Sequence, residues 1–321
     1  MRDAISAYLS GLKLGARQAH ENLTVIPLLA TAEAGVEYVT LDEALKHKVI
    51  EIREINDGGS VQNLKVINRS RSKVLILDGE ELVGAKQNRI SNASFIIPEE
   101  SEKVIPVACI EEGRWRYSSQ SFNSTDSMYA AFGRRAKLQD TTSILRVKRE
   151  FKSDQVKVWD TVKRYLGMSG TNSGTDSFVD YHEQRKADLD GYVSSFKPEP
   201  EQVGVMVLIN GRLQGLDSFG KKTTWRSVFP KLVRSYAMDA IVRSTVEPAA
   251  GPASEMSPEA FLHELTGAPR EAYDSAGIGK DFRIETDNLI GAALVLDDHL
   301  LHLTAFPKDR QKPSQAATPA S

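Results

Sequence analysis

Residues 203–219 read VGVMVLINGRLQGLDSF and carry the strongest secondary-structure signal in the chain. Two apolar runs flank Asn210-Gly211, a residue pair typical of a two-residue β-hairpin turn because both turn positions need a positive φ. The segment therefore predicts a hairpin made of two strands, Val203–Ile209 and Arg212–Phe219.

Beyond the hairpin, the sequence predicts helices and then strands. A helix is expected over roughly Trp225–Val246, and Ser257-Pro258-Glu259 is a favourable start for another because Pro suits the first helical position. Residues 308–321 have little apolar content and are expected to be disordered. Three closing strands are expected at Phe282–Thr286, Gly291–Leu296 and Leu300–Phe306.

Before the hairpin, a β-rich portion precedes a helical one. Residues 23–117 contain short Val- and Ile-rich segments separated by turn signals, and residues 126–196 show helical apolar patterning. Residues 1–22 are expected to form a helical lead, in which apolar side chains recur at helical spacing: Ile5, Leu9 and Leu12.

Two local patterns in the β-rich portion make sharper predictions. Thr40 and Glu43 have the spacing of a capping box, so a short helix is expected over Thr40–Lys48. Residues 77–84 resemble residues 209–215, since each segment is a strand, an Asx-Gly turn and then Leu-x-Gly. Internal duplication and coincidence are both open as explanations of this similarity.

These segments together predict a single α+β domain over residues 23–307, with β-rich residues 23–117, helical residues 126–196 and mixed residues 203–306. The two β-rich portions are expected to pack as one sheet system, with the mid-chain helices to one side.

Composition excludes several classes of protein. The 321 residues include 41 Lys and Arg against 43 Asp and Glu, so a protein that holds nucleic acid mainly by bulk charge is not expected. Cys109 is the only cysteine, which rules out an intramolecular disulfide and a multi-thiolate metal site. No signal-peptide pattern is seen, and no apolar run approaches the ~20 residues of a membrane helix. A soluble cytoplasmic protein is expected.

Motifs for metals and phosphates are incomplete. His182-Glu183 and His263-Glu264 each begin an H-E-x-x-H pattern, but neither has the second histidine. The sequence therefore predicts no metal site, and it identifies no cofactor. The Gly/Ser/Thr-rich residues 167–175 precede a predicted helix, and they are either a linker or a cradle for an anion.

The most informative region is residues 78–117. If residues 80–92 form one strand, both of its faces become polar toward the C-terminal end, as expected for a strand that runs from the core into a cleft. Glu111, Arg114 and Trp115 supply an acid, a bidentate cation and an aromatic platform. We expect a polar pocket for an anionic or nucleotide-like molecule, with Glu111 as the candidate general base. The cationic and amide residues expected to face this ligand are Lys86, Asn88, Arg89 and Arg114.

Other interpretations of these charges are open. The same residues are consistent with a structural ion-pair network at a sheet edge. Residues 134–152 carry seven basic and two acidic side chains, typical of a solvated helix face but also of a surface for an acidic protein partner. A non-enzymatic interaction module is the main alternative function, and an RNA-associated factor is a weaker one because aromatic residues do not alternate with the basic ones. The sequence leaves open whether the protein is an enzyme.

Two runs carry a family resemblance: LDGEELVGAKQNR at residues 77–89 and IPVACIEEGRW at residues 105–115. With the 204–219 hairpin and residues 277–283 and 300–306, they resemble the ARG and rhodanese-phosphatase-superfamily-associated protein domain family over about residues 12–307. The resemblance implies a stand-alone bacterial α+β domain and brings no established reaction. The positions that match its motifs are Glu80, Lys86, Gln87, Asn88, Arg89, Glu111, Arg114 and Trp115.

Overall fold

The computed structural model describes residues 4–246 and 256–308, and it confirms the predicted α+β class. The predicted hairpin lies in the middle of a nine-stranded sheet in this part of the chain, with the order β1-β3-β13-β14-β18-β17-β16-β15 and with β2 beside β3. Asn210 and Gly211 have φ values of 50° and 73°, as the predicted turn requires. The strands of this sheet are β1 (Lys13–Leu14), β2 (Gln18–His20), β3 (Leu23–Leu29), β13 (Gln202–Ile209), β14 (Arg212–Phe219), β15 (Arg270–Asp274), β16 (Lys280–Glu285), β17 (Leu289–Leu296) and β18 (His299–Pro307).

In the described residues, the two β-rich portions do not form the single sheet system expected from the sequence, because the rest of the first portion closes on itself. It forms a closed barrel with the order β11-β6-β5-β12-β8-β9, and a small sheet with the order β10-β7-β4. The barrel strands are β5 (Ile50–Glu54), β6 (Asn63–Asn68), β8 (Glu80–Gly84), β9 (Arg89–Ser91), β11 (Ser101–Cys109) and β12 (Phe122–Met128). The small sheet contains β4 (Val39–Thr40), β7 (Val74–Ile76) and β10 (Phe95–Ile97).

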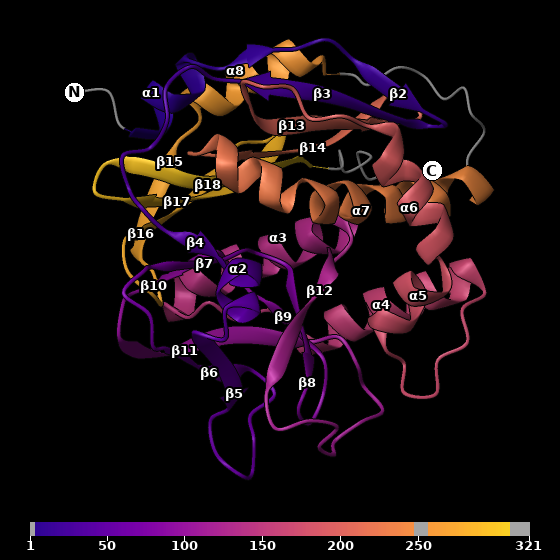
Figure 1. Cartoon of the computed structure of the whole chain (residues 1–321). Coiled ribbons are helices and arrows are strands. Elements are labelled where there is room, and N and C mark those ends of the chain that lie inside the picture. The colour runs from indigo at the N-terminus through magenta and orange to yellow at the C-terminus, as the bar shows by residue number, and fades with distance from the viewer. Residues whose placement is uncertain (1–3, 247–255, 309–321) are drawn as a thin grey trace, which may run out of the picture.

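Helices separate one face of the nine-stranded sheet from the barrel, and other helices cover the opposite face of that sheet (Figure 1). The long helix α7 runs between them, whereas α1 and α8 lie on the opposite side of the sheet. The helices of the described residues are α1 (Ala4–Ser10), α2 (Leu41–Lys46), α3 (Ala131–Lys148), α4 (Gln155–Ser169), α5 (Phe178–Gln184), α6 (Lys186–Ser195), α7 (Lys222–Val246) and α8 (Pro258–Gly267).

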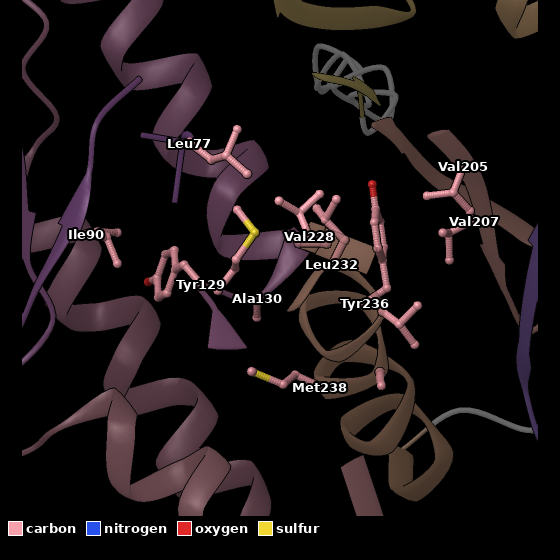
Figure 2. Packing of buried hydrophobic residues seen from close by; sticks show 14 of the residues in the cluster. Leu77, Ile90, Tyr129, Ala130, Val205, Val207, Val228, Leu232, Tyr236 and Met238 are labelled. Atoms are coloured by element: carbon pink, nitrogen blue, oxygen red, sulfur yellow. The ribbon is translucent and has the colours of Figure 1, made fainter. Parts of the chain in front are cut away.

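The main hydrophobic core surrounds α7. Figure 2 shows Leu232 and Tyr236 of this helix between Val205 of β13 and residues of the barrel side such as Ile90. All four side chains are buried, so α7 contributes apolar surface to both β-rich portions at once.

Buried ion pairs join α3 to both sides of this core. Arg134 of α3 contacts Asp217 of β14 at 2.5 Å, and neither side chain is exposed. One turn further along α3, Lys137 is paired with Asp78, which lies in the turn between β7 and β8. Tyr236 donates to the second oxygen of Asp217 at 2.8 Å. Although burial raises the pKa of Asp217, Arg134 and His302 together outweigh it and lower the pKa to about 2.

Several predicted elements are confirmed and several differ. The capping box of Thr40 and Glu43 begins α2, and Ser257 with Pro258 begins α8. The helical lead is wrong beyond Ser10, because residues 13–20 join the large sheet as β1 and β2. The disordered tail predicted for residues 308–321 lies outside the described residues, apart from Lys308.

The strand predicted over residues 80–92 is interrupted. Gly84 has φ 126° and Ala85 has φ 37°, so the chain turns there and β8 pairs with β9 instead of continuing into it. The similarity of residues 77–84 to residues 209–215 also has no structural counterpart, because β7 and β8 belong to different sheets whereas β13 and β14 pair directly.

The Arg134–Asp217 pair gives the first testable prediction. Replacing Asp217 by Asn leaves a buried guanidinium without its counter-charge, and we expect a loss of about 3–5 kcal/mol in the free energy of unfolding, measured by urea denaturation. The matched control is Glu100→Gln, since Glu100 and its partner Arg71 are mostly exposed. That variant is expected to stay within about 0.5 kcal/mol of the parent chain. Equal effects of the two variants would contradict this account.

Candidate functional site

The turn between β8 and β9 places the predicted site residues at one end of the barrel. We call this end the barrel mouth and define it as residues 54–60, 84–89 and 109–119. Gly84 is required there, because a Cβ would lie 2.7 Å from the carbonyl oxygen of Ser121. The turn holds Lys86, Gln87 and Asn88, and Arg89 begins β9.

An ion pair closes this turn. Glu111 follows β11, and its two carboxylate oxygens accept from Arg114 Nε at 2.8 Å and Arg114 Nη2 at 2.6 Å. Both side chains are at most one-tenth exposed. Arg114 also donates to the carbonyl oxygen of Ala85 at 2.7 Å and to Asn88 Oδ1 at 3.1 Å. This bidentate pair therefore fixes the 85–88 turn against the end of β11.

Glu111 has further donors. Its Oε2 accepts from the backbone N–H of Asn88 at 3.0 Å, and its Oε1 accepts from Thr175 Oγ1 at 2.8 Å. Although burial raises the pKa of Glu111, the hydrogen bonds from Arg114 and Thr175 outweigh it and hold the pKa below its ordinary value. These contacts make Glu111 an anchor of the turn, and its role as a general base stays a prediction.

Arg89 is the most unusual residue of the barrel mouth. It pairs across the ladders with Leu82 and Cys109, so its side chain points to the inner side of the barrel, where it is fully buried. Its guanidinium donates to Gln87 Oε1 at 3.0 Å and, weakly, to two carbonyl oxygens, while its Nε has no hydrogen-bond partner. Burial lowers the pKa of Arg89.

No carboxylate among the described residues forms an ion pair with Arg89. Glu54 lies on the same inner side of the barrel, but its oxygens accept from the backbone N–H groups of Ser60 and Lys86, each at 3.4 Å. Glu111 is occupied by Arg114. The barrel mouth therefore contains a buried cation that no carboxylate of the described residues contacts directly, while Glu54 and Glu111 act on its charge from beyond ion-pair distance.

Aromatic rings cover this cation. The Trp115 ring centroid lies 5.7 Å from Arg89 Cζ, and Lys86 Nζ lies 5.3 Å from the Trp115 ring and 5.2 Å from the Tyr117 ring. Lys86 Nζ also donates to the carbonyl oxygens of Asp57 and Gly58 at 2.6 and 3.0 Å. Trp115 and Tyr117 are 46% and 48% exposed. The Trp115 ring lies against the buried guanidinium, whereas the Tyr117 ring contacts Lys86.

Cys109 lies beside Arg89 and is also buried. Its thiol donates to Gln87 Oε1 at 3.2 Å and to the carbonyl oxygen of Glu111 at 3.0 Å. Burial raises the pKa of Cys109, so this thiol helps to orient Gln87 and is not activated as a nucleophile.

Glu80 does not join the other predicted residues. It lies at the opposite end of β8, where Lys231 of α7 donates to its Oε1 at 2.5 Å. Lys231 also contacts Asp42 at 2.7 Å, so Glu80 belongs to an ion-pair network between α7, α2 and the barrel.

The chain after the 167–175 loop contributes residues that sequence reasoning missed. Ser177 Oγ accepts from Asn88 Nδ2 at 3.2 Å, and the carbonyl oxygen of Thr175 accepts from Gly113 at 2.8 Å. A backbone bridge joins Ser177 to Glu111. These contacts span more than 60 residues along the chain, and no local pattern indicates them. Tyr117 and the Asp57–Ser60 turn were also missed, although the Asp57-Gly58-Gly59 turn signal marks the latter.

The basic run at residues 134–152 is not simply a solvated face. Arg134 and Lys137 are buried in ion pairs, and Arg146 contacts Glu271 at 2.7 Å and Glu285 at 2.5 Å. Much of its charge therefore stabilises the fold.

The site and its setting define an α+β protein with a buried, unpaired cation at the end of a small β-barrel. A family model described as the ARG and Rhodanese-Phosphatase-superfamily-associated Protein domain matches residues 11–306, and the chain belongs to this family. Neither the comparison with curated proteins nor that with solved structures found a significant match.

Two surveys of the described residues bear on the kind of site present. Residues 4–246 and 256–308 contain no cluster of three or more His, Cys, Asp and Glu side chains suited to a metal ion. None of the helices in this part of the chain has the length and apolarity needed to span a membrane.

The anchoring role of Glu111 is testable. Glu111→Gln removes the charge that pairs with Arg114, and we expect the free energy of unfolding to fall by about 2–3 kcal/mol in urea denaturation. The control is Glu102→Gln on β11, the strand that precedes Glu111; its carboxylate is mostly exposed in a pair with Lys65, and the variant is expected to change the free energy of unfolding by less than about 0.5 kcal/mol. A Glu111→Gln variant as stable as the parent chain would show that the pair does not anchor the turn.

Proposed function

We propose that the barrel mouth binds a small anionic, nucleotide-like molecule, with Arg89 as its main contact. The observation that carries the proposal is the buried guanidinium of Arg89, which has no ion-pair partner in the described structure. Holding such a charge out of water destabilises a fold, and unfavourable groups of this kind are concentrated at functional sites. A bound anion supplies the missing counter-charge.

The surrounding residues favour an anion that is attached to a flat ring. The guanidinium of Arg89 presents a planar set of donors that suits a phosphate or carboxylate group. The half-exposed Trp115 ring lies against it, and Lys86 adds a second positive charge over the rings of Trp115 and Tyr117. Because the Trp115 ring lies over Arg89, a ligand reaches the guanidinium only when this ring moves aside.

The proposal is one of binding. Catalysis with Glu111 as general base is an additional hypothesis, which requires Arg114 to release one carboxylate oxygen when the ligand binds. The interaction-module and RNA hypotheses lose support because the main basic side chains of residues 134–152 are engaged within the chain. We place the activity in the bacterial cytoplasm as part of the same proposal, on the family resemblance and the single cysteine.

Arg89→Met tests the proposal with two readouts. The first readout is isothermal titration calorimetry with sulfate, adenosine monophosphate and adenosine. The two anions are expected to bind the parent chain. Their affinity for the variant is expected to be at least tenfold lower, roughly the contribution of one charge-assisted hydrogen bond. Adenosine, which lacks the charge, is expected to bind more weakly than its monophosphate. Arg71→Met, at an exposed arginine, is the control and is expected to bind like the parent chain.

Stability is the second readout for the same variants. Since Met fills the space of Arg89 without a buried charge, we expect an unchanged free energy of unfolding or an increase of about 1 kcal/mol. Unchanged anion affinity in Arg89→Met, or no binding of any of the three probes to the parent chain, would contradict the proposal.

A further inference from the structure

Helix α5 connects the barrel mouth to a second titratable group. At its N-terminal end, Ser177 accepts from Asn88, and the N–H of Phe178 donates to the carbonyl oxygen of Ile110 at 2.9 Å. One turn later, His182 reaches the strand β8 that leads into the same mouth. The N-terminal end of this short helix is therefore fixed to the β8–β9 turn and to the residues after β11, and His182 is fixed to β8.

The contact of His182 is with Glu81. His182 Nε2 lies 2.8 Å from Glu81 Oε2, and the side chains are 6% and 0% exposed. Thr125 Oγ1 donates to the same oxygen at 2.8 Å, while Glu81 Oε1 has no hydrogen-bond partner. The buried carboxylate of Glu81 thus depends on His182 for its counter-charge.

His182 also borders a cavity of about 240 Å³, which gives its ring a route for proton exchange with solvent. The other charged groups that line this cavity come from four elements: Asp126 of β12, Glu183 of α5, Lys186 of α6 and Arg234 of α7. Lys186 and Arg234 both pair with Asp126, at 3.1 and 3.4 Å, which leaves the Glu81 charge to His182.

We propose that the His182–Glu81 pair is a proton-controlled latch that holds α5, and through it Thr175 and Ser177, against the barrel mouth. His182 is a positioning residue in this scheme. Protonated His182 keeps the latch closed, so that Ser177 and Thr175 fix Asn88 and Glu111 and the mouth is organised to bind an anion. Neutral His182 leaves a buried, uncompensated carboxylate, and the end of α5 loosens. The effect on affinity rests on the proposed function, whereas the latch itself does not.

The direction of the pH dependence follows from the contacts. Burial lowers the pKa of His182, but the adjacent Glu81 outweighs it and raises the pKa above its ordinary value of 6.5. The stabilising contribution is therefore complete below about pH 6.5, the pKa of an unperturbed histidine, and is lost as the pH rises through the higher pKa of the folded state. Anion affinity and protection of α5 are expected to fall together over this range.

The test uses the full chain between pH 6 and pH 9. Hydrogen exchange of peptides covering residues 175–182, corrected for the intrinsic exchange rate, reports the latch directly. Titration with sulfate, which does not change its charge over this range, reports its effect on the site. The parent chain is expected to lose protection and to bind sulfate at least about fivefold more weakly at the higher pH, the lower end of ordinary coupling between sites.

Three variants separate the latch from general pH effects. His182→Gln is expected to give pH-independent protection at the level of the parent chain at high pH. Glu81→Gln removes the carboxylate that neutral His182 leaves uncompensated, so this variant is expected not to lose protection as the pH rises. His263→Gln, at an exposed histidine on α8, is expected to behave like the parent chain.

The outcomes for the latch and for the proposed function are distinguishable. If His182→Gln keeps the pH profile of exchange shown by the parent chain, the latch is wrong, whatever sulfate does. If exchange shows the expected profile but sulfate binds at no pH, the latch holds and the proposed function fails. If sulfate binds with the same pH dependence in the parent chain and in His182→Gln, the latch does not control the site and the inference is overturned.

Discussion

The buried ion pair between Arg134 and Asp217, together with the Lys137–Asp78 pair one turn along the same helix, links the two β-rich portions of this protein through α3. Arg134 and Lys137 lie one turn apart on α3, and they reach Asp217 in the large sheet and Asp78 in the turn between β7 and β8. Gly79 allows this approach, since a Cβ there would lie 2.9 Å from Arg134 Cγ. The largest hydrophobic cluster of the described residues packs around α7, while these directional contacts select one arrangement of sheet and barrel.

Arg89 differs from the other buried cations of the described residues because it has no carboxylate within ion-pair distance. Buried cations elsewhere in the described interior have carboxylate partners: Arg134 has Asp217, Lys137 has Asp78, Lys231 has Glu80 and Arg283 has Asp281. Arg89 is as deeply buried as these residues but contacts only neutral groups. A fold that pairs its buried cations this consistently leaves one without a contacting carboxylate beneath the half-exposed Trp115 ring, and this contrast is the basis of the anion-binding proposal.

Local patterns in the sequence predicted the elements whose geometry is local. The Asn210-Gly211 hairpin and the capping box at Thr40 are confirmed because turn and cap chemistry act over two to four residues. Most of the predicted site residues lie close together in the structure, because Lys86–Arg89 and Glu111–Trp115 lie on neighbouring strands and the turns next to them. Glu80 was separated from it by the length of β8, which the sequence pattern did not reveal.

The features that the sequence did not predict depend on contacts between residues far apart in the chain. The burial of Arg134 depends on Asp217, 83 residues away, and Thr175 reaches Glu111 across 64 residues. When these partners are unknown, residues 134–152 are interpreted as a basic helix face and residues 167–175 as a loop. The break at Gly84 and Ala85 was hidden for a related reason: their positive φ values are imposed by the close approach of residues 119–121, which belong to another part of the barrel.

The central claim is that the barrel mouth holds an anion at Arg89, and a crystal soaked in selenate tests it most directly. Selenate has the shape and charge of sulfate, and its selenium is located by anomalous scattering. The account predicts an anomalous peak within hydrogen-bonding distance of the Arg89 guanidinium, with the Trp115 ring displaced from its position over that group. Peaks confined to exposed lysines and arginines, with Arg89 still covered by Trp115, would contradict it.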